Sequence, residues 1–186
     1  SEAERFVGST PSLGRSRGWQ NWRACDIFEL ARDQEKRERE ERDPCVVCSL
    51  FGNTGLASHV RFFDSIPLGD YSLETITRVA IERATGGQSP GKLFRVQIVS
   101  PGTLWSFRME LINVDLRNES DPVSFLARYV LRRLFEGVQV GGGRSVGYGA
   151  VKLLREGLSI RVTSVREGEL RTEELGPELL GELSGG

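Results

Sequence analysis

The residues in this 186-residue chain that are best suited to bind a metal are its three cysteines and its one histidine. Cys45 and Cys48 form a C-x2-C pair, with Cys25 upstream and His59 downstream. Three thiolates and one imidazole would make a closed tetrahedral zinc site. The spacing, C-x19-C-x2-C-x10-H, is not that of a standard zinc finger, so three reduced thiols and an unrelated histidine are the alternative. His59 is the weakest of the four expected ligands, because a strand position can point it away.

A second chemically useful stretch runs from Thr77 to Phe94, where two apolar-alternating segments flank a tip rich in Gly, Ser and Pro. That pattern predicts a long β-hairpin, or finger. Cations on a finger can bind phosphates, and apolar side chains beside them can wedge between bases. The residues of interest on the two arms are Arg78, Arg83, Lys92, Arg95, Val79, Ile81 and Phe94. On composition alone, an ordinary solvated hairpin is the better interpretation.

Two glycine-rich stretches also carry cations. GGGRSVGYG, residues 141–149, lacks the GK[ST] of a Walker loop, and it follows a helix rather than a strand, so it is not a Rossmann turn. Its glycines leave backbone N–H groups free to approach a phosphate. GRSRG, residues 14–18, offers a shorter version. The candidate contacts are Gly141, Gly142, Gly143, Arg144 and Ser145 in the first stretch, and Arg15 and Arg17 in the second. The alternatives are a plain connector and a basic turn.

The clearest predicted element is a helix over residues 122–136, with an i, i+3, i+4, i+7 apolar stripe, Asp121 as N-cap, Pro122 at N1 and Gly137 just past the end. Arg128, Arg132 and Arg133 are expected on its solvent face. An earlier helix is expected to begin at Trp19, after a loop-like segment 1–18. A run of charges, residues 33–43, is expected to be a solvated helical extension or a mobile loop, and not a site.

Three strands are predicted around these helices. In residues 58–64 we expect Val60, Phe62 and Phe63 to be buried, with Arg61 alternating outward, where it could meet phosphate. The strand over residues 103–114 has imperfect alternation, which predicts a bulge near Ser106. A further strand spans residues 158–165.

Three segments in this order, CVVCSLFGNTGLASHVRFFDS, the Thr77–Phe94 finger and GGGRSVGYGAVKL, resemble the RAMP superfamily of CRISPR systems. The likeness is greatest to backbone subunits of type III effector complexes and covers roughly residues 15–154. It implies an α+β, ferredoxin-like or RRM-type fold with a long β-hairpin finger. It also implies contacts with CRISPR guide RNA, target RNA and other RAMP subunits. Related subunits carry zinc in the cysteine region.

The expected element order departs from the βαββαβ of a ferredoxin-like fold, because no first strand precedes Trp19. We expect that strand to be missing, supplied in trans or replaced by residues 158–165. The expected domain is residues 1–165, with the finger inserted at 70–95, followed by an acidic tail or linker at 166–186. In target-cleaving relatives the catalytic aspartate follows the first strand, and this chain has no matching position. Asp64 has a structural place in the family motif.

Composition limits the classes of function. A net charge of −1 excludes bulk polycation behaviour, so nucleic-acid contacts must come from local patches. No apolar run approaches a membrane span and no signal peptide opens the chain, which predicts no membrane partner. Three cysteines without a secretory signal predict a reducing, cytoplasmic setting.

The expected function is therefore a guide-RNA-binding backbone subunit, or a segment of one, that is not catalytic by itself. Two alternatives remain. One is a metal-dependent endoribonuclease that cuts bound target RNA, which needs a carboxylate–metal site. The other is a structural scaffold segment of a split or fused RAMP protein.

Overall fold

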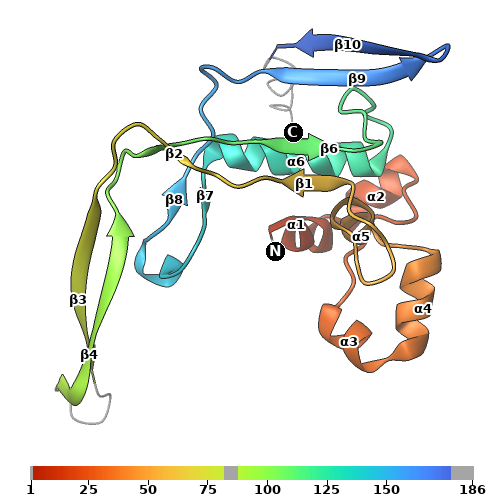
Figure 1. Ribbon diagram of the computed structural model, residues 1–186. Helices are drawn as coiled ribbons and strands as arrows, with labels where there is room; N and C mark the ends of the chain where they lie inside the picture. The colour runs from red at the N-terminus through yellow and green to blue at the C-terminus, as the bar shows by residue number, and fades with distance from the viewer. Residues whose placement is uncertain (1, 82–87, 177–186) are drawn as a thin grey trace. The chain divides into compact units, whose positions relative to one another are not determined.

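The computed structural model describes residues 2–81 and 88–176 (Figure 1). The chain forms two compact units, one made of Ser1–Arg61 with Glu110–Gly186 and the other of Phe62–Met109. We call them unit 1 and unit 2. Helices and small antiparallel sheets occur together, which confirms the α+β class.

Unit 1 contains the helices and three small sheets. Its helices are α1 (Glu2–Ser9), α2 (Pro11–Arg17), α3 (Ile27–Arg32), α4 (Gln34–Arg42), α5 (Val46–Phe51) and α6 (Pro122–Glu136). Its strand pairs are β1 (Val60–Phe62) with β6 (Met109–Leu111), β7 (Val138–Gln139) with β8 (Ala150–Val151), and β9 (Ile160–Arg166) with β10 (Glu169–Leu175). In the described part of the chain each sheet has two strands, so the four-stranded ferredoxin-like sheet remains a prediction.

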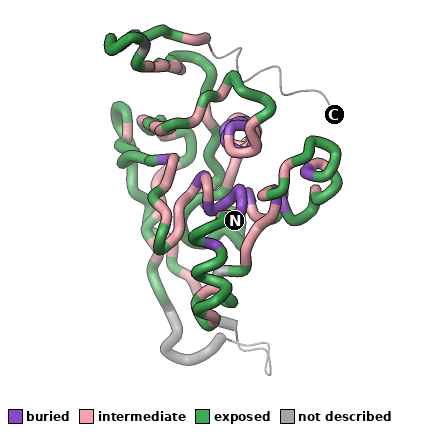
Figure 2. Tube along the Cα trace, turned by 90° about the vertical axis from the view of Figure 1, so that its right-hand side faces the viewer, coloured by how far each residue is buried: buried purple, intermediate pink, exposed green. Residues whose placement is uncertain are grey.

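The core of unit 1 lies where α1, α5 and α6 pack together, and the buried residues concentrate there (Figure 2). Its largest fully buried apolar side chains are Leu50, Leu126, Val7 and Val46. Burying a side chain of this size contributes about 1.5–3 kcal/mol. Trp22 joins this core edge-on, with its ring centroid 5.9 Å from that of Phe6 and 5.7 Å from that of Phe125.

Helix α6 begins and ends where the sequence predicts. Asp121 caps it, accepting a hydrogen bond from the Ser124 N–H at 2.7 Å, and Gly137 ends it with a φ of 112°. The prediction for Arg128 is wrong, because this side chain is buried. The buried stripe is centred on Ser124, Ala127 and Leu131, and Arg128 belongs to it. Its Nη1 donates to Glu119 Oε1 at 2.8 Å, which offsets part of the desolvation cost.

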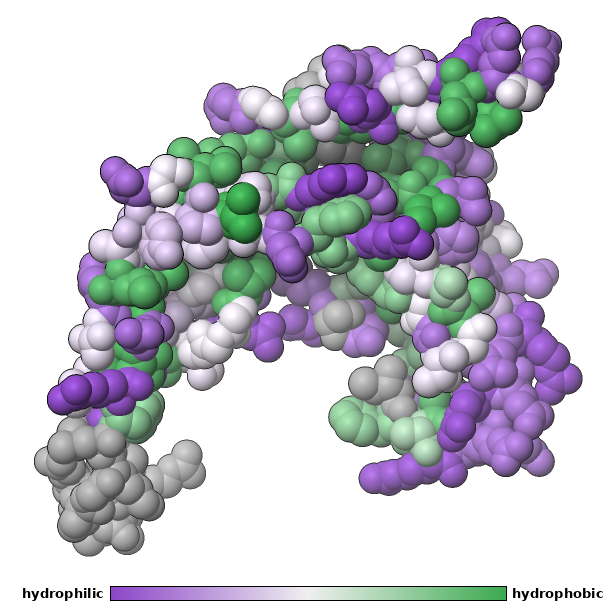
Figure 3. Space-filling model, viewed as in Figure 1, coloured by the Kyte–Doolittle hydropathy of each residue, from purple (hydrophilic) through white to green (hydrophobic). Residues whose placement is uncertain are grey.

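The N-terminal expectations are also wrong. Residues 1–18 are not a loop, because they contain α1 and α2; α1 buries only Ala3 and Val7, a stripe too short to recognise in the sequence. The next helix begins at Ile27 rather than Trp19, with Asp26 as its cap. Trp19 and Trp22 pack into the core from a non-helical segment, so the spacing between them does not indicate a helix. The charged run 33–43 does form a helix, α4, whose side chains give that part of unit 1 a hydrophilic surface (Figure 3).

Around the short sheets the predictions hold in part. Val60 is buried and Arg61 is exposed, as predicted. Phe62 and Phe63 are both exposed. Strand β1 ends at Phe62, so the alternation of buried and exposed side chains does not continue beyond Arg61. The strand at 160–166 is confirmed. Glu169–Leu175, in the stretch expected to be an acidic tail, pairs with β9 throughout its length.

Unit 2 is built on the predicted finger. Strands β3 (Leu73–Ile81) and β4 (Gln88–Val99) pair antiparallel from Leu73↔Val99 to Val79↔Leu93, with an irregularity before Ile81. Next to them, β2 (Pro67–Leu68) pairs with β5 (Leu104–Trp105). The single strand expected over residues 103–114, with a bulge near Ser106, is not formed. Strand β5 ends at Trp105, β6 begins at Met109, and the two pair with different strands, β2 and β1.

Candidate metal centre and nucleic-acid interface

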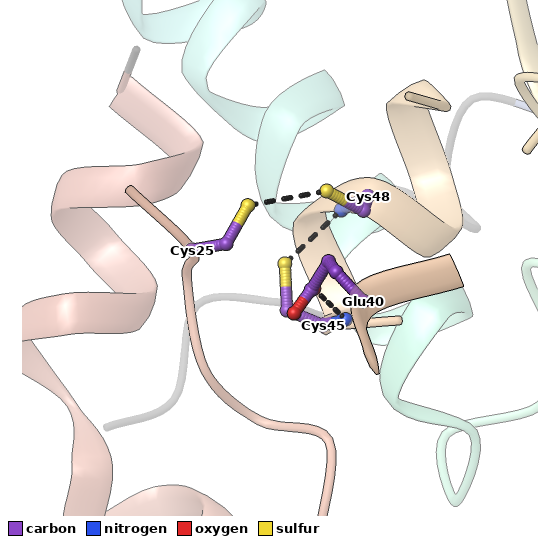
Figure 4. A group of neighbouring side chains, drawn as sticks. All are labelled: Cys25, Glu40, Cys45 and Cys48. Carbon is purple, nitrogen blue, oxygen red and sulfur yellow. Dashed lines mark hydrogen bonds between the residues drawn. The ribbon is translucent and has the colours of Figure 1, made fainter. Parts of the chain in front are cut away.

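Four side chains in unit 1 form a candidate metal centre: Cys25, Glu40, Cys45 and Cys48 (Figure 4). Their potential ligand atoms all lie within 4.8 Å of one another. Zinc–sulfur bonds of about 2.3 Å place two thiolates of a tetrahedral site roughly 3.8 Å apart, so a cluster of this size can close around one ion. Three sulfurs and one carboxylate oxygen are donors that zinc accepts.

Three segments bring these donors together. Cys25 precedes α3, Glu40 lies on the last turn of α4, and Cys45 and Cys48 lie at the start of α5. Cys45 is the N-cap of α5, and its Sγ accepts a hydrogen bond from the Cys48 N–H at 3.4 Å. The Val46 N–H donates to the Asn21 carbonyl at 2.8 Å, which ties α5 to the segment before Cys25.

Glu40 is buried and is fixed from two sides. Its Oε1 accepts from the Cys45 N–H, and its Oε2 accepts from Arg23 Nη1, each at 2.5 Å. Arg23 also pairs with Asp43 at 3.4 Å. Burial opposes the negative charge of Glu40, but the hydrogen bonds from Arg23 and Cys45 outweigh it and lower the pKa of the carboxyl. A charged oxygen is therefore held beside the three sulfurs.

The surroundings raise the pKa of two of the thiols, Cys25 and Cys45, and so favour their protonated form when no cation is bound. Burial raises the pKa of Cys45 to about 11. Burial, together with the hydrogen bond to Cys48, also raises the pKa of Cys25. A metal ion that binds here must displace these protons, as zinc does when it binds cysteine.

His59 does not join the cluster; the fourth member is Glu40. The His59 Nδ1 lies 2.7 Å from the Ile112 carbonyl oxygen, and its backbone bonds to Leu50 and Ile112. Glu40 was missed because it stands in a run of charges, and only its burial distinguishes it from the glutamates beside it.

The glycine-rich loop connects β7 to β8, so a two-residue strand precedes it, and not the helix expected from the sequence. The Val140 N–H donates to the Gly149 carbonyl at 2.9 Å, and a Cβ on Gly149 would lie 1.8 Å from the Val140 oxygen, so only glycine fits there. No atom lies within 4 Å of the Cβ positions of Gly141 and Gly142, so ligand atoms can approach the backbone at both positions. Arg144 and Ser145 are exposed in a 3-10 turn, η1 (Arg144–Val146). Within the described residues Arg144 has no ion-pair partner.

On the finger, register places two of the predicted contacts together. Arg78 lies directly opposite Phe94, so both side chains are on one face of the β3–β4 ladder, and Phe94 is 50% exposed. Arg95 lies opposite Thr77 and belongs to the other face. Arg83 lies outside the described residues, as do the side chains of Lys92, Val79 and Ile81.

The two arginines of the GRSRG turn differ in their surroundings. Arg15 is exposed on the last turn of α2. Arg17 donates to the Glu119 carbonyl at 3.1 Å, and its guanidinium lies 5.1 Å from the ring centroid of Trp19 and 5.0 Å from that of Phe125. Part of the donor capacity of Arg17 is thus already used within unit 1.

A comparison with protein-family models identifies the family to which the chain belongs. The model of the RAMP superfamily matches residues 20–152. The chain belongs to the RAMP superfamily. Membership carries a general role in CRISPR-associated RNA binding. The matched region contains the cysteine cluster, the finger and the glycine-rich loop, whereas α1, α2, β9 and β10 of this RAMP protein lie outside it.

A comparison with curated proteins gave no match. No helix in the described residues of this RAMP protein is both long and apolar enough to cross a membrane.

Proposed function

We propose that this RAMP protein is a backbone subunit of a type III CRISPR effector complex, where it binds guide RNA and the guide–target duplex alongside other RAMP subunits. The family match over residues 20–152 carries this proposal. Two exposed cations, Arg95 on the finger and Arg144 on the glycine-rich loop, support it, because the chain has no general positive charge with which to bind RNA.

In the proposed interface, the glycine-rich loop and the finger bind different parts of the RNA. The glycine-rich loop presents open backbone N–H groups at Gly141 and Gly142 and a cation at Arg144, a combination suited to phosphate. The finger presents Phe94 beside Arg78, a combination suited to an unstacked base and its phosphate. Exposed Arg61 and Arg15 are further candidate phosphate contacts, and Arg83 and Lys92 extend the finger's set.

We assign the metal centre to structural zinc, held by Cys25, Cys45, Cys48 and Glu40. Four protein donors leave no open position for a substrate, which is the form of a structural site rather than a catalytic one. Bound zinc would supply a cross-link among the segment before α3, the end of α4 and the start of α5. Arg23 would orient the Glu40 carboxylate from behind.

The proposal is tested by fluorescence anisotropy of the full chain with three probes: single-stranded guide RNA, a guide–target RNA duplex and a DNA duplex of the same sequence. We expect both RNA probes to bind more tightly than the DNA duplex. The target strand should remain intact with divalent metal present. Equal affinity for RNA and DNA would contradict the RNA-binding role, and metal-dependent cutting would favour the endoribonuclease.

A further inference from the structure

Two sulfurs of the metal centre lie closer together than a shared zinc ion requires. The Sγ atoms of Cys25 and Cys48 are 3.3 Å apart, whereas thiolates on one tetrahedral zinc are separated by roughly 3.8 Å. Cys25 is also the one cysteine that is not buried. Solvent therefore reaches Cys25 first, and Cys25 contacts the sulfur of Cys48.

Cys45 is in a different position. It has no exposed surface, and its Sγ accepts the Cys48 N–H while it caps α5. Cys48, three residues further along in the C-x2-C pair, is therefore better placed than Cys45 itself to react with Cys25. The pairing favoured by geometry joins two distant segments, rather than the two cysteines that are close in sequence.

We propose that Cys25 and Cys48 form an oxidation site, which hydrogen peroxide converts to a disulfide with release of the bound metal. The metal-release half rests on the zinc centre proposed above, and neither half depends on RNA binding. The pairing rests on the contact between the Cys25 and Cys48 sulfurs and on the exposure of Cys25. It also rests on the hydrogen bond that the Cys45 sulfur already accepts from the Cys48 N–H.

The chemistry balances with peroxide as the oxidant. Once the Cys25 thiol has lost its proton, the thiolate attacks one peroxide oxygen, so that an S–O bond forms, the O–O bond breaks and hydroxide leaves. The Cys48 thiolate then attacks the Cys25 sulfur, so that the S–S bond forms, the S–O bond breaks and a second hydroxide leaves. The two sulfurs lose two electrons in total, and one peroxide gains them.

The product can no longer hold zinc. Only Cys45 and Glu40 remain as donors, and a structural site requires four. The disulfide still joins the segment before α3 to α5, as the metal does, but it has no bond to α4. Oxidation therefore replaces a metal cross-link among three segments with a disulfide between two of them. The third segment, α4, is then held at this point by the hydrogen bonds of Glu40 to Arg23 and Cys45.

Trypsin distinguishes a disulfide of Cys25 from one within the C-x2-C pair, and a cysteine variant then identifies the partner of Cys25. Cleavage after Arg23 and Arg32 places Cys25 on one peptide, and cleavage after Arg42 and Arg61 places Cys45 and Cys48 together on another. A Cys25–Cys48 disulfide joins the two peptides, whereas a Cys45–Cys48 disulfide leaves them separate. The Cys45→Ser variant must keep the joined product if Cys48 is the partner, and Cys25→Ser must lose it.

The experiment begins with zinc analysis of the full chain, followed by peroxide treatment, peptide mass spectrometry and a zinc-binding dye. We expect joined peptides, zinc release in proportion to them, and reversal by dithiothreitol and added zinc. A Cys45–Cys48 disulfide as the main product would overturn the pairing, as would loss of the joined product in Cys45→Ser. Absence of zinc at the start would overturn both the metal-release half and the proposed metal centre, while the peptide map still decides the pairing.

Discussion

Arg144 is an exposed cation, and its removal should lower RNA affinity without changing the stability of the fold. It lies in the loop between β7 and β8 beside backbone that a ligand can approach. Arg144→Ala should weaken binding of all guide sequences alike, because phosphate contacts carry no sequence information. The slope of log affinity against log salt should fall by about one unit for one lost contact. Anisotropy across a series of salt concentrations measures both.

Arg171→Ala is the matched control for that measurement. It removes the same charge from exposed β10, outside the region that matches the RAMP family. Its affinity and slope should equal those of the wild type. If Arg144→Ala behaves like Arg171→Ala, the glycine-rich loop is only a connector.

Substitutions of Glu40 and of His59 should have different effects on zinc affinity. Glu40→Ala removes the carboxylate beside the three sulfurs and should lower zinc affinity by at least about 10-fold, the lower end of what loss of an outer-shell partner costs. His59→Ala should keep the zinc, because that ring contacts the Ile112 carbonyl instead. Competition with a chelator of known affinity measures both variants. Retention by Glu40→Ala and loss by His59→Ala would restore the histidine as a ligand.

The cysteines were predictable from sequence, and the fourth donor was not. A C-x2-C pair is visible as a motif, and a third cysteine in a short chain is an obvious companion. Glu40 is one of several glutamates in a charged helix, and helical periodicity without apolar residues does not show which of them turns inward. Its selection depends on Arg23 and on the Cys45 backbone, which approach it only in the folded chain.

At the scale of elements, the finger has two faces that should differ in function. Phe94→Ala should weaken binding of unpaired RNA by roughly 5- to 150-fold, since one stacked base contributes about 1–3 kcal/mol. Arg95→Ala, one residue further on, removes a cation from the opposite face of the same ladder and should cost less. Binding of a single-stranded guide by the two variants gives the comparison. A larger loss for Arg95→Ala would assign RNA to the other face.

Elements with strong local signals were predicted well, and elements defined by long-range packing were not. Helix α6 has its cap, its proline and its apolar stripe in its own sequence. Helix α1 contributes two buried residues, and its burial comes from partners far along the chain. Trp19 and Trp22 contact the ring of Phe125 on α6 and lie outside any helix, so their apolar character reflects packing on α6 and not a helical stripe. Arg128 is buried because Glu119 is there to pair with it.

At the scale of the whole molecule, the metal centre would add a cross-link to parts of unit 1 that are otherwise joined by hydrogen bonds and the Arg23–Glu40 ion pair. Its donors come from before α3, from α4 and from α5, and α5 packs on α6 in the core through Val46 and Leu50. Loss of zinc should therefore loosen residues 20–51 first, and only then weaken the core. The helical core has its own buried side chains, so we expect destabilisation rather than the complete unfolding seen in a small zinc finger.

Chelation of the purified full chain tests this expectation. Removing zinc should lower the melting temperature by several degrees, since each kcal/mol corresponds to about 2–4 °C in a chain of this size. Amide hydrogen exchange should rise in residues 20–51 and stay unchanged in β3 and β4, which lie in unit 2 and serve as an internal control. Restored zinc should restore both readings, because the ligands are part of the fold. Equal exchange in the 20–51 segment with and without zinc would mean that the cysteine cluster does not cross-link this region, and α4 and α5 would then depend on packing and on the Arg23–Glu40 pair alone.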